Sequence, residues 1–198
     1  WFAESPRVLS IPPPKRHGEK STLAKQLKHL LINLALVEIT QTGFERIVRF
    51  KLSSRPGKEI EKELIVELMG RHSNIFLLDN TSKVITLGKK IKDSQSRLRP
   101  IGTGDMYTSP PPLKGLAPKS SESFNSWKEN ICLVPSTFKN SLKNTYQGIS
   151  PALVLQIASN NYNESIKIIN QLVTNIELKT WEALYQNWKV WLLDIETN

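Results

Sequence analysis

The sequence predicts an α+β protein in which an antiparallel β-sheet or sandwich is followed by an all-helical subdomain. Three observations lead to this prediction. Apolar and polar residues alternate from Ala35 to about Leu87, apolar residues recur at helical spacing from Phe124 onward, and a stretch rich in Gly and Pro separates the two regions. We therefore expect a β-rich domain over residues 1–112 and a helical subdomain over residues 113–198.

Composition narrows the class of protein. The single cysteine, Cys132, excludes a disulfide framework and favours a reducing compartment, so we expect a cytoplasmic location. The three histidines and Cys132 lack metal-ligand spacing, and we expect neither a metal nor another cofactor. No apolar run has the length of a membrane span. The net charge of +9 indicates an anionic partner, nucleic acid before membrane.

The first predicted element is a helix that begins after Ser21, a suitable N-cap residue. The leucines that follow recur at helical spacing: Leu23, Leu27, Leu30, Leu31 and Leu34. Residues 1–20 are expected to form an extended connector, because the prolines at 12–14 disfavour both helix and central strand. The opening Trp-Phe pair is typical of a strand interior, so we interpret the chain as a fragment that begins partway through a domain.

Five strands are predicted next, near residues 35–41, 44–52, 62–69, 74–79 and 83–88. The connections between them are short, which favours antiparallel pairing, since a parallel partner needs a long crossover. We expect a meander of neighbouring strands with the helix packed on one face.

Arg46 is the unusual residue of the second strand. Alternation places it on an otherwise apolar face, whereas the opposite face is charged and is expected to contact water. The residues of the charged face are Glu45, Ile47, Arg49 and Lys51. A buried arginine needs a partner, because desolvating it unpaired costs several kcal/mol. Two interpretations stay open: Arg46 pairs with a carboxylate such as Glu67, or it lies at the strand end and binds a phosphate or a base.

The turn between the third and fourth strands is polar and lies between two apolar runs. Its hydrogen-bonding residues follow one another directly: Arg71, His72, Ser73 and Asn74. Such a set suits contacts to sugar, phosphate or base edges. A solvated turn without a function tolerates the same residues, and the turn sequence does not choose between the two.

After Gly88 the chain becomes basic and rich in Ser, Gly and Pro, which predicts a linker or a loop that clasps two subdomains. Helices are expected near residues 124–131, 136–146, 151–160, 164–175 and 178–195. The last helix carries an aromatic stripe of the kind found in a core or at a docking face. The stripe consists of Trp181, Leu184, Tyr185, Trp188, Trp191, Leu192 and Ile195. A homodimer in which a second copy of the chain caps this stripe is one expectation.

Two of these helices are joined by a short hairpin in which Ser150 and Pro151 form a helix-start signature. The hairpin resembles a helix-hairpin-helix, whose free backbone N–H groups, here around Gly148 and Ser150, bind a phosphate. Lys139 and Lys143 lie one turn apart on the first helix and would flank that phosphate. An ordinary αα-hairpin is the alternative.

Sequence motifs for catalysis are absent. We find no Ser/His/Asp set in a recognisable context, no Gly-rich phosphate loop with a Lys-Ser/Thr pair and no HExxH. Cys132 lies in a helix-end context and is expected to be a small buried hydrophobic residue rather than a nucleophile. We therefore expect no enzymatic activity.

Five segments together resemble the N-terminal domain of the NFACT family, in the same order and over nearly the whole chain. They are the helix segment STLAKQLKHLLINLALVEI, the strand TGFERIVRF, the hairpin ELMGRHSNIFLLD, the loop GTGDMYTSPP and the hairpin YQGISPALVLQI. The family includes bacterial RqcH proteins, also called fibronectin-binding protein A, and eukaryotic NEMF-type relatives.

The resemblance implies a non-catalytic domain of Fpg-like fold, here truncated at its start, with a helical part that leads toward a coiled coil. Family members bind the large ribosomal subunit obstructed by peptidyl-tRNA, recruit tRNA and, in bacteria, support alanine tailing of stalled chains. The family's acidic–Arg pair corresponds to Glu45 and Arg46, although many bacterial members have Asp in place of Glu. The family's E-x-M-G-R segment corresponds to Glu67, Met69, Gly70 and Arg71.

Two other functions remain as alternatives. The older family name suggests an adhesin that binds fibronectin or fibrinogen, and the Fpg-like fold suggests a DNA-binding protein of the glycosylase type. One cysteine supports neither a disulfide-stabilised adhesin nor the four-cysteine zinc finger of many Fpg-type enzymes. RNA binding is therefore the function that we expect.

Overall fold

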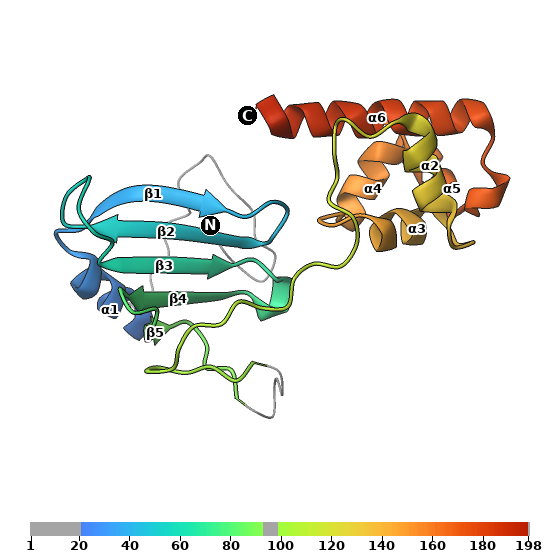
Figure 1. Cartoon of the computed structure of the whole chain (residues 1–198). Helices are drawn as coiled ribbons and strands as arrows, with labels where there is room; N and C mark the ends of the chain where they lie inside the picture. The colour runs from blue at the N-terminus through green and yellow to red at the C-terminus, as the bar shows by residue number, and fades with distance from the viewer. Residues whose placement is uncertain (1–20, 93–98, 198) are drawn as a thin grey trace. The chain divides into compact units, whose positions relative to one another are not determined.

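The computed structural model describes residues 21–92 and 99–197. The chain divides into two compact units, residues Trp1–Pro112 and Leu113–Asn198. The described part of the first unit is one helix and a five-stranded antiparallel sheet, and the second unit is helical (Figure 1). This arrangement confirms the α+β fold class that the sequence predicts.

The sheet unit begins with α1 (Thr22–Leu31), which is followed by five strands. These are β1 (Ala35–Gln41), β2 (Ile47–Ser53), β3 (Lys62–Glu67), β4 (Asn74–Asp79) and β5 (Val84–Leu87), with the 3-10 helix η1 (Gly70–His72) between β3 and β4. They pair in chain order, each antiparallel to the next. The strand β2 begins later than predicted, because the backbone N–H of Glu45 donates to the carbonyl of Thr42 (3.0 Å) and closes a turn before it.

The strand β1 is the outermost strand of the described sheet. Two of its apolar side chains are largely exposed, Leu36 at 52% and Ile39 at 57%. A register shift between Leu36 and Glu38 makes Val37 an extra residue relative to β2, which is a β-bulge.

The helix α1 covers part of one face of the sheet. Its N-terminus forms where predicted, because the Ser21 hydroxyl accepts a hydrogen bond from the backbone N–H of Ala24 (3.1 Å). The Thr86 hydroxyl on β5 donates to the side-chain oxygen of Gln26 (2.7 Å), which attaches α1 to the sheet. Thr86 lies opposite Leu77 in the ladder, so α1 is on the face that carries the Leu77 side chain.

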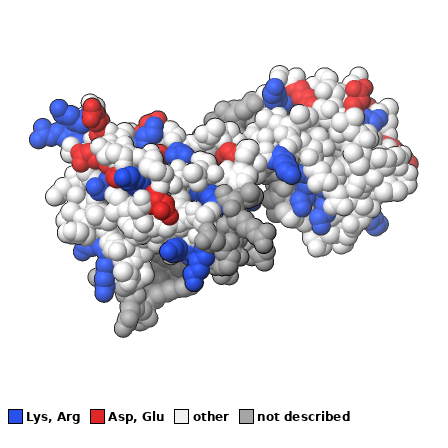
Figure 2. Space-filling view, turned by 60° about the horizontal axis from the view of Figure 1, so that its bottom comes forward, with Lys and Arg blue, Asp and Glu red and all other residues white. Residues whose placement is uncertain are grey.

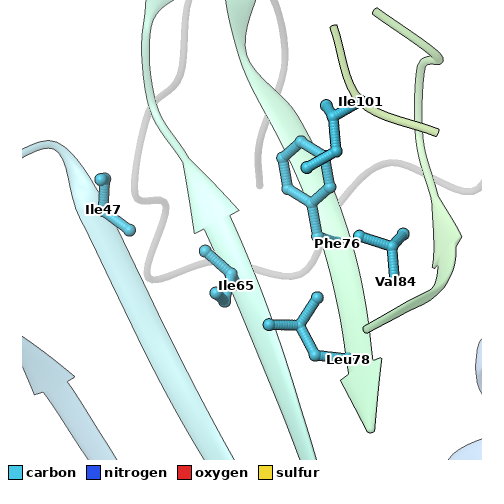
Figure 3. Packing of buried hydrophobic residues seen from close by; sticks show 6 residues of the cluster. All are labelled: Ile47, Ile65, Phe76, Leu78, Val84 and Ile101. Atoms are coloured by element: carbon cyan, nitrogen blue, oxygen red, sulfur yellow. The ribbon is translucent and has the colours of Figure 1, made fainter. Parts of the chain in front are cut away.

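The opposite face carries the main apolar cluster of the unit. Its members are Ile47, Ile65, Phe76, Leu78, Val84 and Ile101, none more than 8% exposed. Five of them come from the strands, and Ile101 lies against the ring of Phe76 from the segment that follows β5 (Figure 3). The sequence analysis expected the face of β2 that carries Ile47 and Arg49 to contact water. That prediction was wrong, because Ile47 belongs to this buried cluster.

Residues 99–109 cover this face and are held there by backbone hydrogen bonds. Ile91 and Ile101 exchange two of them (3.1 and 3.0 Å), and the backbone N–H of Tyr107 donates to Ser82 (2.9 Å). Val84 also accepts from Gly104 (2.8 Å) and donates to Asp105 (2.9 Å). This part of the predicted linker is therefore a structural layer of the sheet unit.

The described part of the helical unit, residues 113–197, contains five α-helices and a short 3-10 helix. They are α2 (Phe124–Cys132), α3 (Phe138–Thr145), α4 (Pro151–Ala158), α5 (Tyr162–Asn170), η2 (Val173–Asn175) and α6 (Leu178–Thr197). The single helix predicted over 164–175 ends at Asn170 and is followed by η2. The reason is tertiary: the backbone N–H of Phe138 donates to Gln171 (2.9 Å) and that of Val173 to Ser136 (3.0 Å), which pulls this segment into a bridge.

Aromatic side chains fill the core of the helical unit. Tyr146 and Trp188 lie 4.8 Å apart between ring centroids, and Trp127 contacts both Trp181 and Trp188. Most of the predicted α6 stripe is core: Trp181, Leu184, Trp188 and Leu192 are at most 2% exposed. These four side chains have their partners within the unit and do not require a second copy of the chain.

We expect Leu142→Ala to lower the free energy of unfolding of the helical unit by about 2–5 kcal/mol, because Leu142 is fully buried (0% exposed) and its removal leaves a cavity. Four of the five tryptophans lie in this unit and Trp1 belongs to the other, so tryptophan fluorescence during urea unfolding reports chiefly on this unit. Val190→Ala, at a position that is 59% exposed, is the control, with an expected change under about 0.5 kcal/mol. Equal losses in the two variants would contradict the burial of Leu142 in the core of this unit.

Candidate nucleic-acid interface

Three connections with candidate residues lie at one end of the sheet. Because neighbouring strands are antiparallel, the β1–β2 turn, the β3–β4 connection with η1 and the chain that leaves β5 share this end (Figure 1). A hydrogen bond joins the first two directly: the backbone N–H of Leu68 donates to the carbonyl of Arg46 (2.8 Å). The acidic–Arg pair and the polar turn are thus neighbours in space although they are distant in sequence.

Arg46 is exposed, whereas Glu45 is half-buried. Glu45 lines a hollow of about 280 Å³ whose other lining residues are Thr42, Ile47, Arg49, Ser109, Pro110 and Pro112. The exposed position of Arg46 at the start of β2 agrees with the interpretation in which its guanidinium is presented at the strand end. Pairing with Glu67, the alternative for Arg46, does not occur.

Glu67 is 1% exposed and lies beneath this end of the sheet. Its carboxylate accepts hydrogen bonds from both terminal nitrogens of the Arg99 guanidinium, with Nη1 at 3.0 Å from Oε2, and a further one from the Tyr107 hydroxyl (2.8 Å). The Nε of Arg99 donates to the carbonyl of Thr108. Burial therefore leaves this carboxylate no surface to offer a nucleic acid. Glu67 is an ion-pair partner, as one of the two interpretations of Arg46 expected, but its arginine is Arg99.

A second ion pair lies beside the first on the same face. Arg49 Nη1 is 3.1 Å from Glu63 Oε2, and its Nη2 donates to the Ser109 hydroxyl (3.3 Å). The guanidinium carbons of Arg49 and Arg99 are 5.5 and 5.2 Å from the centre of the Tyr107 ring. Burial, followed by the negative charge of Glu67, raises the pKa of the Tyr107 hydroxyl well above its ordinary value.

Sequence reasoning did not single out Arg99 or Tyr107 as partners of Glu67. A signal was present: Glu67 alternates with Ile65 on β3, so it belongs to the buried face and requires a cation. The sequence analysis offered Arg46 as the partner of Glu67. The actual partner, Arg99, lies after the last strand, in a segment whose apolar residues show no regular spacing. No sequence pattern there indicates which arginine side chain is buried.

The polar turn divides into surface and structural residues. His72 is exposed, and of Arg71 only the backbone in η1 is described. The Ser73 hydroxyl accepts a hydrogen bond from the backbone N–H of Met69 (3.0 Å), which closes the turn. Gly70 has a φ of 58°, a left-handed conformation that favours glycine. Asn74 is only 6% exposed, and its amide bonds to the backbone of Lys89.

The hairpin between α3 and α4 forms as predicted. The Ser150 hydroxyl accepts a hydrogen bond from the backbone N–H of Leu153 (3.1 Å) and caps α4, with Pro151 at its first position. Gly148 has a φ of 74°, which allows the tight reversal. Of the two lysines on α3, Lys143 is exposed and Lys139 is half-buried. The backbone N–H groups of Gly148 and Ile149 donate to no other described residue.

We also searched the described residues for a metal site, a membrane-spanning helix and a reactive cysteine. Residues 21–92 and 99–197 contain no group of three His, Cys, Asp or Glu side chains arranged to hold a metal ion. No helix among them combines the length and the apolar character needed to cross a bilayer. Burial raises the pKa of the Cys132 thiol, which disfavours the reactive thiolate. Lysine and arginine side chains lie on the surface of both units, with carboxylates interspersed (Figure 2).

The whole chain, residues 1–198, matches the model of the family described as NFACT N-terminal and middle domains. The chain belongs to the NFACT family. It is 31% identical over 153 residues to the Rqc2 homolog RqcH of Streptococcus suis, an alignment that covers 74% of this chain and 27% of that protein. It is 39% identical over 84 residues to the Rqc2 homolog RqcH of Bacillus subtilis, covering 41% of this chain and 15% of the relative. The NFACT chain thus spans a minor part of these relatives.

Solved structures share its fold. The N-terminal part of the fibronectin/fibrinogen-binding protein of Streptococcus suis has a TM-score of 0.55 and 27% identity, covering 79% of this chain and 61% of that one. The N-terminal domain of the fibronectin-binding protein PavA of Streptococcus pneumoniae has a TM-score of 0.54 and 26% identity, covering 71% and 56%. The fold class and the family of this NFACT chain therefore agree with the resemblance of its motifs.

We expect Glu67→Gln to lower the free energy of unfolding by about 3–5 kcal/mol, because the substitution removes the carboxylate charge that pairs with the buried Arg99 guanidinium. Glu63→Gln is a matched control on the same face of β3. The Arg49 and Glu63 side chains are 30% and 17% exposed, so water screens this pair more than it screens Glu67 and Arg99, and the expected loss is about 1 kcal/mol. Urea denaturation followed by far-ultraviolet circular dichroism measures both. A loss for Glu63→Gln as large as that for Glu67→Gln would show that burial does not set the energy of the pair.

Ionisation of the Tyr107 hydroxyl at alkaline pH is expected to destabilise the sheet unit. Because its pKa is raised in the folded state, its contribution is fully present below the ordinary tyrosine pKa of about 10 and is lost as the pH rises above that value. We expect the free energy of unfolding of Tyr107→Phe to fall less between about pH 9 and pH 11 than that of the unmodified chain. Tyr162→Phe, at an exposed position, controls for the loss of a hydroxyl. An unchanged fall in Tyr107→Phe would contradict the assignment.

Proposed function

We propose that this NFACT chain is a non-catalytic RNA-binding module of a ribosome-associated quality control factor. Its ligands would be tRNA and the large ribosomal subunit that carries peptidyl-tRNA, and its role would be to support alanine tailing of stalled nascent chains. The observation that carries the proposal is the hydrogen bond from Leu68 to Arg46. It brings the backbone of the Glu45–Arg46 pair next to the connection that contains Arg71 and His72, which supports a single binding surface made by the two motifs.

The chemistry of this surface suits RNA. A guanidinium at the strand end, as in Arg46, binds the sugar–phosphate backbone through several donors in a fixed plane. The adjacent carboxylate of Glu45 accepts hydrogen bonds from amino groups on base edges. The net charge of +9 adds long-range attraction to any polyanion. Transfer of the peptide would belong to the ribosome, so the module itself needs no catalytic residue.

The helical unit adds a contact that does not depend on sequence. The backbone N–H groups of Gly148 and Ile149 and the capped start of α4 suit a phosphate, and Lys143 on α3 adds a positive charge. Lys139 lies one turn before Lys143 and is half-buried, so its aliphatic stem packs on the protein and its ammonium group would contact the phosphate. Backbone contacts of this kind fit a ligand that is recognised by shape.

The relatives support this proposal through their names, since the curated proteins that match are Rqc2 homologs. A second candidate function comes from the two solved structures described above, both of which are named for binding fibronectin or fibrinogen. Fibronectin therefore belongs in the same assay as tRNA. Duplex DNA belongs there as well, because the Fpg-like fold suggests it.

We expect the unmodified chain to bind unfractionated tRNA more tightly than duplex DNA of equal length, with affinity that falls steeply as salt is raised. Arg46→Ala should weaken tRNA binding by about tenfold, the loss of roughly one arginine contact, without lowering the melting temperature. Fluorescence anisotropy at several salt concentrations measures the first change, and circular dichroism the second.

Arg55→Ala is the matched control, because Arg55 is exposed at the opposite end of the sheet. If both variants lose the same affinity, the contact is a general charge effect and the assignment of Arg46 fails. Saturable binding of fibronectin together with no selective binding of tRNA would replace the proposed function by the second candidate.

A further inference from the structure

The chain that leaves β5 is fixed against the polar turn by Asn74. The Asn74 side chain donates to the carbonyl of Lys89 (2.8 Å) and accepts from the backbone N–H of Lys89 (2.9 Å). The next pair in the ladder continues this attachment, because the backbone N–H of Gly88 donates to Ile75 (2.8 Å). Asn74 is only 6% exposed, and its side-chain amide fixes the backbone of Lys89.

The two residues held at this position, Lys89 and Lys90, present their side chains at the surface. Both are exposed, whereas the following Ile91 packs against the apolar cluster and bonds to Ile101. The Lys90 stem passes over Gly102, where a β-carbon would lie 3.3 Å from its Cε. Within residues 21–92 and 99–197, no carboxylate forms an ion pair with either lysine. The nearby Asp105 carboxylate accepts from the backbone N–H of Gly102 (2.7 Å).

These lysines lie at the same end of the sheet as Arg46. The ladder order is β1-β2-β3-β4-β5, so three strand spacings separate the start of β2 from the end of β5. At about 4.8 Å per spacing this is roughly 15 Å, with η1 and the exposed His72 between the two positions. Cationic residues thus lie at both ends of the row of connections at this end of the sheet.

We propose that Lys89 and Lys90 form a second phosphate-binding position for the RNA strand that contacts Arg46, and that Asn74 is the residue that positions them. The inference rests on the proposed function, because it extends the surface at this end of the sheet. Lysine ammonium groups are point charges without the planar fork of arginine, so they bind backbone phosphates and do not read bases. The ligand at this position is the sugar–phosphate backbone of RNA, whatever its sequence.

The test is the double variant Lys89→Gln/Lys90→Gln in the full chain, titrated with unfractionated tRNA at several salt concentrations. Loss of two phosphate contacts should reduce the magnitude of the slope of log affinity against log salt by about 1.4, at roughly 0.7 per contact for a single strand. Arg55→Gln/Lys58→Gln removes the same charge from the β2–β3 connection, at the opposite end of the sheet. Its slope should change by less than half as much.

The outcomes separate the inference from the function on which it rests. If the unmodified chain binds tRNA selectively and the two double variants have the same slope, the lysine position is refuted and the proposed function stands. If the unmodified chain shows no selective binding of tRNA, the proposed function fails and this inference fails with it. If the slope is reduced in Lys89→Gln/Lys90→Gln and not in Arg55→Gln/Lys58→Gln, the result supports both the lysine position and the proposed function.

The positioning role of Asn74 has its own readout. Asn74→Ala, measured below its melting temperature, should weaken tRNA binding in the unmodified background but cause little further loss in the Lys89→Gln/Lys90→Gln background. A residue that only stabilises the fold would give the same loss in both backgrounds. Additive losses would therefore overturn the role of Asn74 and leave that of the lysines in place.

Discussion

The sheet unit depends on a buried ion pair, Glu67 with Arg99, in which the carboxylate is 1% exposed and the arginine 8%. Two desolvated charges cost several kcal/mol each, and the pair is tolerable because its hydrogen-bonding groups are satisfied by Tyr107 and the carbonyl of Thr108. Both belong to the segment that covers the apolar cluster of the sheet. The pair therefore attaches the covering layer to β3 as well as satisfying its own charges.

Buried polar groups need hydrogen-bond partners, and this requirement divides the polar residues at this end of the sheet into two groups. The side chains of Ser73 and Asn74 bond to the backbone and complete the hydrogen bonding of the turn and of the chain that leaves β5. Arg46, His72 and Lys89 are exposed. Residues that are adjacent in sequence, such as His72 and Ser73, thus have opposite roles. The stabilising contacts of the inner group fix the backbone from which the outer group extends.

Local signals were sufficient for most of the fold. The caps at Ser21 and Ser150, the alternation along β3 and β4 and the short turns predicted the elements, because each depends on neighbours in sequence. The failures concern contacts between distant residues. The partner of Glu67 lies 32 residues away, and the helix α5 ends early because a bridge to Thr137 captures the chain at Leu172. For the site, motif positions were predictable, but which of their side chains turn inward was not.

The bulge at Val37 has a consequence for how the protein behaves in concentrated solution. Within residues 21–92 and 99–197, β1 is an outer strand, and such a strand presents a row of N–H and C=O groups on which a strand of another molecule can form. The exposed Leu36 and Ile39 make β1 attractive in this respect. The extra residue breaks the regular spacing of that row near the start of the strand and increases its twist. An incoming strand would find only a short stretch in register, so β1 is a poorer template for aggregation than its apolar side chains suggest.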